Sequence, residues 1–309
     1  MKVAVLIPCY NEEITIGKVI DDFKRVMPEA DIYVYDNNSK DKTSEIALEH
    51  GAIVKKEYRQ GKGNVVRSMF RDIDADYYIM VDGDDTYPAE FAHKLLDPLI
   101  REEADMTIGD RLSNGTYYNE NKRNFHDFGN NMVRWLINKL FKSNIKDIMT
   151  GYRGFNREFV KAMPVLSARF EIETEMSIHA LDKKFLIKEV AIDYRDRPEG
   201  SESKLNTFSD GFKVLKTIFM LFKDYKPLLF FNIWTVFFLV VGLLVGVPVL
   251  VEFADTRYIT KVPSAILAVG LVLLSMNTFA CGVILDTVVK QQRFNYELYL
   301  NDLRDKYKK

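Results

Sequence analysis

Cysteine is scarce in this chain, which has two, Cys9 and Cys281, among 309 residues. They fall in an apolar segment near the start and a long apolar run near the end, so we expect no disulfide between them and a reducing compartment. There is no excess of positive charge either: the formal net charge is −1, which does not favour a nucleic-acid partner. Only five apolar residues precede Pro8, too few for a secretory signal. The N-terminal part is therefore expected to stay in the cytosol.

The sequence also lacks the best-known nucleotide-binding patterns. It contains no Gly-x-Gly-x-x-Gly and no Walker sequence, which argues against dinucleotide-dependent dehydrogenases and P-loop enzymes. No internal repeat or low-complexity tract is visible, which leaves an ordinary globular domain as the expectation for the first two thirds.

Short apolar segments alternate with helical ones over that part of the chain. This alternation predicts an α/β domain of parallel βαβ units, with ligands at the carboxyl ends of the strands. A polar stretch, 112–132, is expected to form a loop over the site or on the surface. The expected strands are 3–7, 32–35, 52–54, 77–81 and 188–191, and the expected helices are 12–27 (with Asn11 as N-cap), 43–49, 61–70, 130–141 and 171–181.

The most informative segment is an acidic cluster, Asp82-Gly83-Asp84-Asp85, directly after the apolar run 77–81. Carboxylate oxygens are the ligands that Mg²⁺ and Mn²⁺ prefer, and these ions are commonly shared with substrate phosphates. Asn11 and Asp36 follow the first two expected strands in the same way. The shared position of these side chains indicates one site at one edge of the sheet.

Two uncharged apolar runs, 228–251 and 262–285, follow the α/β part. Each exceeds the ~20 residues that a helix needs to cross a bilayer. Lysines precede the first run and basic residues follow the second, so the positive-inside rule places both flanks in the cytosol. The alternative is a pair of core helices. Such a hairpin could also pack against copies of itself as a homo-oligomer.

Apolar residues also recur at helical spacing just before the first run, at Phe212, Leu215, Phe219 and Phe222, with lysines between them. This pattern is typical of a helix that lies on the membrane surface. A core helix of the α/β domain is the alternative.

Four segments resemble, in order and spacing, those of the family 2 glycosyltransferases: Pro8–Glu12, Asp36–Ser39, Gly61–Asn64 and Asp82–Pro88. The most similar members are polyprenyl-phosphate glycosyltransferases, which include dolichol-phosphate mannose synthase and the bacterial enzymes that load glucose or N-acetylglucosamine onto undecaprenyl phosphate. The resemblance covers residues 1–227. It implies a Rossmann-like GT-A fold, a nucleotide-diphosphate-sugar donor, Mg²⁺ or Mn²⁺ as cofactor, and inversion at the anomeric carbon.

The resemblance also divides the chain and assigns the donor site. Together with the apolar runs and the helical pattern before them, it predicts a catalytic domain over 1–208, an interfacial helix over 209–227, a transmembrane hairpin over 228–289 with spans near 228–251 and 262–286, and a cytosolic tail over 290–309. Asp84 would be the main metal ligand, with Asp82 near the donor ribose and the metal, and Asp85 either a second ligand or solvated. The implied donor-binding residues are Pro8, Tyr10, Asn11, Glu12, Asp36, Asn38, Lys62, Asp82, Gly83 and Asp84.

A second group of residues is implied for the acceptor. The segment from Asp147 to Phe155 resembles the family pattern Asp-x-x-x-Gly-Phe/Tyr-Arg, which makes Asp147 the candidate acceptor-site carboxylate, as a base or as an orienting group. A buried structural Asp is the alternative, and Glu173 is the competing carboxylate. The candidate phosphate-binding residues are Arg111, Arg153, Arg197, Ser203 and Lys204, with surface salt bridges as the alternative.

These inferences together predict a membrane-anchored glycosyltransferase with Asp147, Asp82 and Arg111 as its catalytic residues. It would move one sugar, from UDP-N-acetylglucosamine or UDP-glucose, to a polyprenyl phosphate at the cytosolic face. Two other functions stay open: a polysaccharide or glycolipid synthase of the same fold, and a non-catalytic membrane scaffold with a decayed sugar-nucleotide domain.

Overall fold

The N-terminal unit is built on one sheet of seven strands. The computed structural model describes the chain except residues 115–123, 169–170, 199–218, 221 and 308–309. The strand order is β3-β2-β1-β4-β6-β5-β7. The strands are β1 (Val3–Cys9), β2 (Asp31–Asp36), β3 (Ile53–Lys56), β4 (Tyr77–Met80), β5 (Met106–Asp110), β6 (Arg153–Asn156) and β7 (Ile187–Ala191).

The sheet is mixed, which corrects the expectation of purely parallel units. β1 to β4 are parallel to one another, but β6 runs antiparallel to both of its neighbours, β4 and β5. Sequence patterning missed β6 because it has only four residues, among them an arginine and a glycine. Its direction has a consequence for the site. Because β6 is antiparallel, the segment that leads into it arrives at the edge where β4 and β5 end.

Helices cover both faces of this sheet. On one face, α1 (Ile16–Val26), α2 (Thr43–Glu49) and α4 (Ala92–Ile100) pack on alternate residues of β1, such as Val5 and Ile7, in one apolar core. On the other, α3 (Lys62–Asp72) and α7 (Arg157–Ala162) meet through Phe70, Phe155 and Phe159, and α8 (Ile172–Asp182) joins them through His179. The period-two pattern of a strand explains why β1 contributes to both cores.

Two helix starts differ from the sequence-based expectation. The first helix begins at Ile16 with Thr15 as its N-cap residue, whereas Asn11 adopts a positive φ of 53° in the loop before it. Asn tolerates this left-handed conformation because its side chain bonds to nearby backbone. Further on, α6 (Asn124–Phe141) begins inside the stretch 112–132 that was expected to be a loop.

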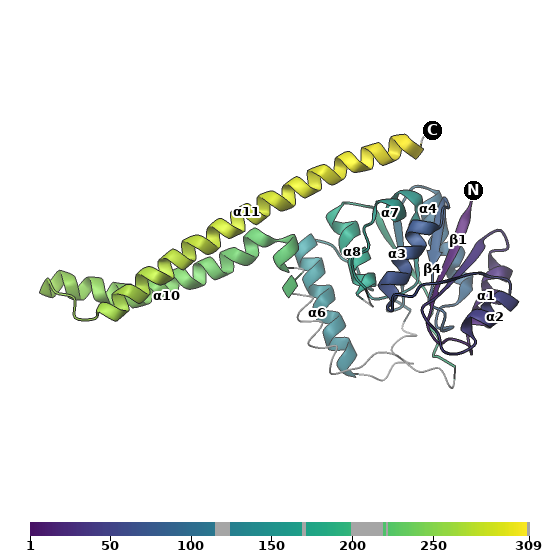
Figure 1. The fold of residues 1–309 in the computed structure, drawn as a ribbon, viewed down its shortest axis with the longest axis horizontal. Coiled ribbons are helices and arrows are strands. Elements are labelled where there is room, and N and C mark those ends of the chain that lie inside the picture. Colours follow the sequence, from purple (N-terminus) through teal and green to yellow (C-terminus); the bar gives the residue numbers. More distant parts are fainter. Residues whose placement is uncertain (115–123, 169–170, 199–218, 221, 308–309) are drawn as a thin grey trace. The chain divides into compact units, whose positions relative to one another are not determined.

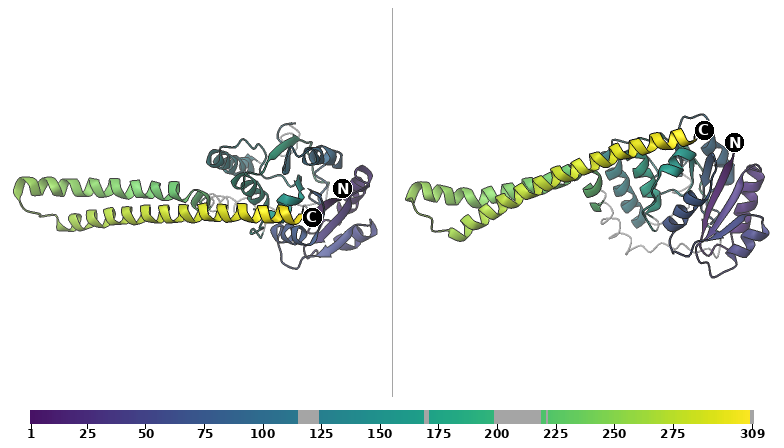
Figure 2. Two further views of the ribbon diagram at one scale, coloured as in Figure 1. Left: turned by 90° about the horizontal axis from the view of Figure 1, so that it is seen from above. Right: turned by 45° about the horizontal axis from the view of Figure 1, so that its top comes forward.

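The C-terminal part forms a helical hairpin, α10 (Pro227–Thr256) and α11 (Val262–Tyr307), whose antiparallel course is visible in Figure 1 and Figure 2. The Thr235 and Thr278 hydroxyls lie 3.1 Å apart, and Ser275 donates to the Thr235 carbonyl at 3.0 Å. Small residues and hydroxyls of this kind let two helices approach closely in an apolar medium.

Both hairpin helices are long and apolar enough to cross a membrane. Their most apolar windows have mean hydropathies of 2.6 and 2.1, and only 11% and 17% of these windows are buried. A pair of core helices would be mostly buried, so that alternative does not fit. The chain divides into two compact units, 1–210 with 303–309, and 211–302. Most of the expected interfacial helix, 209–227, lies outside the described residues.

Candidate functional site

The loops after β1 and β2 form one wall of the candidate donor site. Parallel pairing of β1 with β2 brings Cys9 opposite Asp36, so the two loops start side by side. The Ser39 hydroxyl accepts from the Asn11 amide at 2.9 Å, and the Asn11 side-chain oxygen accepts from the Lys40 amide at 2.8 Å. The buried Asp36 carboxylate accepts from the Ser44 hydroxyl at 2.7 Å. These bonds hold Asn11 and Asp36 in fixed positions at one edge of the sheet.

The acidic cluster lies next to this wall, after β4. β4 pairs directly with β1, and the Thr15 hydroxyl donates to the Gly83 carbonyl at 2.6 Å. Asp84 is 4% exposed and accepts from the Thr86 hydroxyl at 2.6 Å. Burial, followed by repulsion from Asp82, raises the pKa of Asp84 above its usual range. Pro8, near the end of β1, and Tyr10, Glu12 and Asn38, in the neighbouring loops, are only partly buried.

Lys62, at the start of α3, bridges two carboxylates. Its ammonium lies 2.5 Å from an oxygen of Asp82 and 2.5 Å from an oxygen of Glu173 on α8. Burial acts to lower the pKa of Lys62, but the two carboxylates outweigh it and the net pKa is raised. Lys62 therefore stays charged, and it neutralises both Asp82 and Glu173, the competing acceptor carboxylate.

Asp84 also has a cationic partner. The Arg197 guanidinium lies 2.5 Å from its second oxygen. The segment that carries Arg197 is held over the cluster, because the Arg195 amide donates to the Thr86 carbonyl at 3.0 Å. Asp85 pairs instead with Lys18 of α1 at 2.7 Å, which places its charge in a surface ion pair.

The carboxylates of Asp82 and Asp84 fit a hard divalent cation. Repulsion from Asp82 adds to the effect of burial on the pKa of Asp84, and each of the two carboxylates is neutralised here by a cation of the chain. Mg²⁺ needs only one or two carboxylates when substrate phosphates complete its shell. Among the described residues no cluster of three or more potential metal-binding side chains occurs, so such an ion would depend on the substrate for further ligands.

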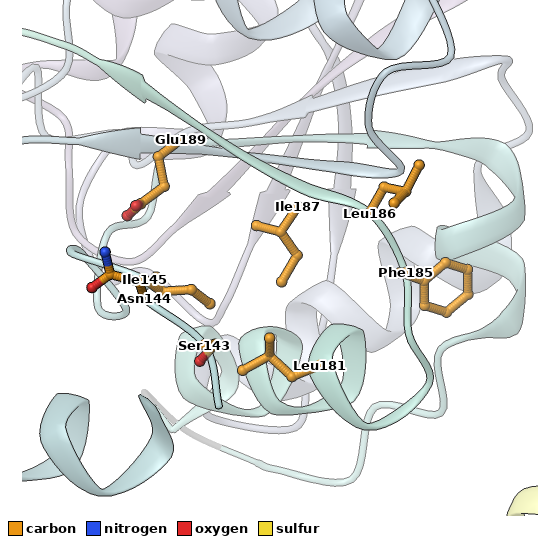
Figure 3. A pocket seen from close by; sticks show the side chains of 8 residues that line it. All are labelled: Ser143, Asn144, Ile145, Leu181, Phe185, Leu186, Ile187 and Glu189. Atoms are coloured by element: carbon orange, nitrogen blue, oxygen red, sulfur yellow. The ribbon is translucent and has the colours of Figure 1, made fainter. Parts of the chain in front are cut away.

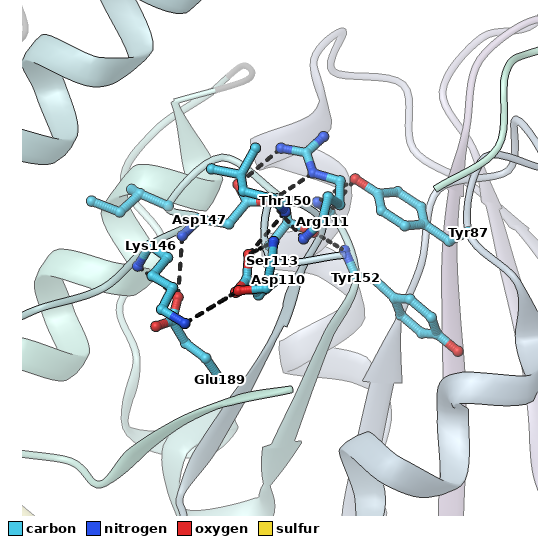
Figure 4. Close-up of polar contacts among 12 residues, drawn as sticks. Tyr87, Asp110, Arg111, Ser113, Lys146, Asp147, Thr150, Tyr152 and Glu189 are labelled. Carbon is cyan, nitrogen blue, oxygen red and sulfur yellow. Dashed lines mark hydrogen bonds and ion pairs between the residues drawn. The ribbon is translucent and has the colours of Figure 1, made fainter. Parts of the chain in front are cut away.

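The second half of the site is an ion pair between Arg111, after β5, and Asp147, before β6 (Figure 4). The guanidinium donates to both carboxylate oxygens, at 2.7 and 2.9 Å, and the Arg111 amide adds a third bond at 3.2 Å. The ring centres of Tyr87 and Tyr194 lie 6.0 and 5.5 Å from the central carbon of the guanidinium. Two-pronged pairing and aromatic contact hold the guanidinium plane in one orientation.

Gly151 joins the two halves. A Cβ atom at this position would lie 2.3 Å from the Asp82 carboxylate, so a larger residue would require that carboxylate to shift. The Gly151 amide donates to the Tyr87 hydroxyl at 3.0 Å. Burial raises the pKa of Tyr87, which keeps this hydroxyl neutral.

Arg153 does not occupy the position expected of a phosphate-binding residue. Its side chain is fully buried, and it donates to the carbonyls of Ile148 and Thr150 and to the Ser177 hydroxyl. Burial lowers its pKa to about 10. The assignment is corrected: Arg153, at the start of β6, holds the backbone of the Asp147 loop through these bonds. Ser203 and Lys204 lie outside the described residues.

Sequence reasoning missed a polar network around the Arg111–Asp147 pair, formed by Asp110, Lys146 and Glu189 (Figure 4). Asp110 accepts from the Leu112 amide at 2.9 Å, and Glu189 accepts from the amides of Lys146 and Asp147 at 2.7 and 3.1 Å. Asp110 could have been noticed as the neighbour of Arg111. Glu189 carries no signal, because a single acidic residue in an edge strand is ordinary.

A pocket of about 310 Å³ lies beside this network (Figure 3). Its walls are mostly apolar, and Glu189 contributes the carboxylate on one side. The lining residues are Ser143, Asn144, Ile145, Leu181, Phe185, Leu186, Ile187 and Glu189. None of the sequence-predicted site residues that the structure describes lines it, so it does not coincide with the candidate donor site.

Comparison with solved structures identifies the fold. Glucosyl-3-phosphoglycerate synthase of Mycobacterium tuberculosis matches with a TM-score of 0.57 and 20% identity over 72% of this chain and 80% of that chain. This similarity shows the fold, a mixed α/β sheet of the GT-A glycosyltransferase type. The acidic pair after β4 lies at the carboxyl edge of such a sheet.

Sequence comparison then gives the family. Residues 4–163, more than half of the chain, match the family described as "Glycosyl transferase family 2", to which this protein therefore belongs. The glycosyltransferase AglJ of Haloferax volcanii is 32% identical over 295 residues, 94% of this chain and 95% of its own. The dolichyl-phosphate hexose transferase of the same organism is 33% identical over 215 residues, 70% of this chain and 91% of its own. The protein is thus a glycosyltransferase, as the sequence predicted.

Proposed function

We propose that this glycosyltransferase moves a single sugar from a UDP-sugar to a polyprenyl phosphate at the cytosolic face of a membrane. The observation that carries the proposal is the rigid Arg111–Asp147 pair beside the acidic pair, in a chain that ends in two apolar helices. The name of the dolichyl-phosphate hexose transferase supports a lipid-phosphate acceptor. A polyprenyl phosphate presents its headgroup at the membrane surface, and a hairpin anchor would keep the site there.

The proposed reaction is a single displacement. A phosphate oxygen of the acceptor attacks the anomeric carbon, the bond from that carbon to the donor diphosphate breaks, and the configuration inverts. The acceptor phosphate is already largely ionised near neutral pH, so little deprotonation is needed, and Asp147 orients Arg111 toward it. A divalent ion held by Asp84 and Asp82 would neutralise the diphosphate that leaves. Arg197, now on Asp84, would transfer to the phosphates when the donor binds.

The donor is proposed to be UDP-N-acetylglucosamine or UDP-glucose, with Mn²⁺ or Mg²⁺. The solved relative from M. tuberculosis was crystallised with Mn²⁺ and UDP, which supports a uridine nucleotide and a divalent ion. A donor screen with purified protein, short-chain polyprenyl phosphate and each metal tests this directly. Asp84→Asn should abolish transfer while the protein still inserts in the membrane, and full activity of that variant would contradict the proposal.

Product analysis separates the two remaining alternatives. One sugar per lipid supports the proposed function, whereas a growing chain would indicate a polysaccharide or glycolipid synthase. A non-catalytic scaffold is disfavoured because Asp82, Asp84 and Asp147 are all present and in contact with cationic partners. Failure to bind Mn²⁺ and UDP would restore the scaffold alternative.

A further inference from the structure

The loop from Lys142 to Tyr152 carries Asp147 without any regular secondary structure. Its backbone amides therefore need acceptors other than a helix or sheet ladder. Asn138 of α6 provides the acceptor at the start of the loop, where its side-chain oxygen accepts from the Ile145 amide at 3.0 Å. Tyr87 serves the end, at Gly151. The centre of the loop, where Asp147 lies, is served by Glu189.

Glu189 lies in β7, the outermost strand, opposite Ile108 of β5. One of its carboxylate oxygens accepts both the Lys146 amide at 2.7 Å and the Asp147 amide at 3.1 Å. Bonds from neutral amides to a charged acceptor are stronger than bonds between neutral groups. Burial raises the pKa of Glu189, while the bonds from the Asp147 and Lys146 amides act in the opposite direction and favour the carboxylate. In such a partly buried place each of these bonds counts for more.

The turn that carries Arg111, the ion-pair partner of Asp147, is also held by a carboxylate. The Asp110 carboxylate accepts from the amides of Leu112 and Ser113, at 2.9 and 3.2 Å, and so shapes the turn that carries Arg111. Lys146 connects the two anchors: its ammonium lies 3.2 Å from the Ser113 hydroxyl and 3.8 Å from Asp110, while its amide binds Glu189. Figure 4 shows this network beside the ion pair.

We propose that Glu189 is a positioning residue: it fixes the backbone of Lys146 and Asp147, and through it the Arg111–Asp147 pair, in the geometry that binds the acceptor phosphate. This inference rests on the proposed function, because it assigns the pair to the acceptor half of the reaction. It predicts that removing the Glu189 carboxylate lowers the efficiency with which the enzyme uses the polyprenyl phosphate. The donor half of the site, held by Lys62 and Arg197, should be unchanged.

The pocket beside Glu189 makes a clean substitution available (Figure 3). Ile145 and Ile187 line it together with Glu189, so an unbranched apolar side chain of similar length has compatible neighbours. Glu189→Met removes the hydrogen-bond acceptor at nearly constant size, and Glu189→Gln keeps one acceptor oxygen without the charge. The control is Lys188→Ala on the same strand, an exposed side chain that pairs only with Glu103 among the contacts described.

The experiment measures transfer kinetics for donor and acceptor separately, together with amide hydrogen exchange over residues 143–152. Glu189→Met should lower kcat/KM for short-chain polyprenyl phosphate about tenfold or more, with the KM for the UDP-sugar changed less than about twofold, and it should speed exchange in the loop about tenfold. Glu189→Gln should recover activity to within about threefold of the unsubstituted protein, and Lys188→Ala should behave like that protein.

Three results would overturn the positioning role. They are an equal loss of kcat/KM for the UDP-sugar and the polyprenyl phosphate, no recovery of activity in Glu189→Gln, and unchanged amide hydrogen exchange in Glu189→Met. Failure of the proposed function looks different: the unsubstituted protein would then transfer no sugar to a polyprenyl phosphate. In that case the exchange data still decide whether Glu189 anchors the loop, because they need no substrate.

Discussion

Gly151 and Asp82 are in such close contact that a methyl group on Gly151 would lie 2.3 Å from a carboxylate oxygen of Asp82. The loop of the acceptor half thus lies directly on the acidic pair of the donor half. Lys62 holds the same carboxylate through its other oxygen, at 2.5 Å, so a shift of Asp82 would also disturb this ion pair.

Gly151→Ala should therefore impair function more than folding. The new methyl group displaces the Asp82 carboxylate, and we expect Mn²⁺-dependent UDP binding to weaken about tenfold or more, with a small change in the melting temperature. Calorimetric titration and thermal unfolding measure the two effects. Gly270→Ala is the matched control, because a Cβ atom there meets nothing within 4 Å. Normal UDP binding by Gly151→Ala would contradict the close contact.

Lys62→Met should destabilise the protein by about 3–5 kcal/mol, because it leaves the charges of Asp82 and Glu173 partly buried without their cation. The free energy of unfolding checks this. Adding Glu173→Gln to the same chain removes one of the two unpaired charges and should recover part of the stability without restoring transfer. A single variant as stable as the parent would show that the bridge contributes nothing.

Arg197→Gln should change metal and donor affinity in opposite directions. In the structure Arg197 occupies one oxygen of Asp84, so its removal frees that oxygen and should raise Mn²⁺ affinity in the absence of donor about threefold or more. Affinity for UDP in the presence of Mn²⁺ should fall, because a phosphate partner is lost. Electron paramagnetic resonance of Mn²⁺ and calorimetry report these values.

Arg195→Gln is the control for Arg197, since Arg195 pairs at 3.6 to 3.8 Å with Glu90 and Asp85 on the surface. It should leave Mn²⁺ affinity unchanged. If both variants change the Mn²⁺ affinity equally, the effect comes from net charge alone. That result would contradict the proposal that Arg197 moves from Asp84 to the donor phosphates.

Arg111→Lys keeps the positive charge but loses the two-pronged bond to Asp147. Lysine presents a point charge instead of a planar fork, so we expect kcat/KM for the acceptor to fall about tenfold or more. Asp147→Asn and the double variant complete a thermodynamic cycle on the same quantity. Because the two residues act as one unit, their effects should be far from additive, and additive losses would show that they act separately.

His179 should make the protein sensitive to mild acid. Burial lowers its pKa to about 4, against about 6.5 in the unfolded chain. The unfolded state therefore binds a proton first as the pH falls through 6.5, and stability should decrease by ~2 kcal/mol between pH 7 and pH 5. Unfolding measured at both pH values checks this. His179→Phe, which suits the neighbours Phe159 and Phe185, should remove this part of the pH dependence, whereas a variant of the exposed His93, His93→Gln, should not.

Elements that depend on local pattern could be predicted from the amino-acid sequence. Alternating short strands and helices gave the α/β class, and the acidic cluster after β4 gave the edge of the sheet where the site lies. The two uncharged apolar runs predicted the helices that are long and apolar enough to cross a membrane, because each run exceeds the ~20 residues that a helix needs for this. The order and spacing of four short segments gave the family.

Tertiary structure alone decided how the site is assembled. The direction of β6, which brings Asp147 to the end of β4, depends on pairing with strands far away in the chain. Three further contacts join residues that are 24 to 111 positions apart in the chain. They are the bond from Arg153 to Ser177, the bond from the Asp147 amide to Glu189 and the bridge from Lys62 to Glu173. A charged side chain carries no local sign of whether it will face substrate or backbone. That is decided by which partners the fold brings within hydrogen-bond distance.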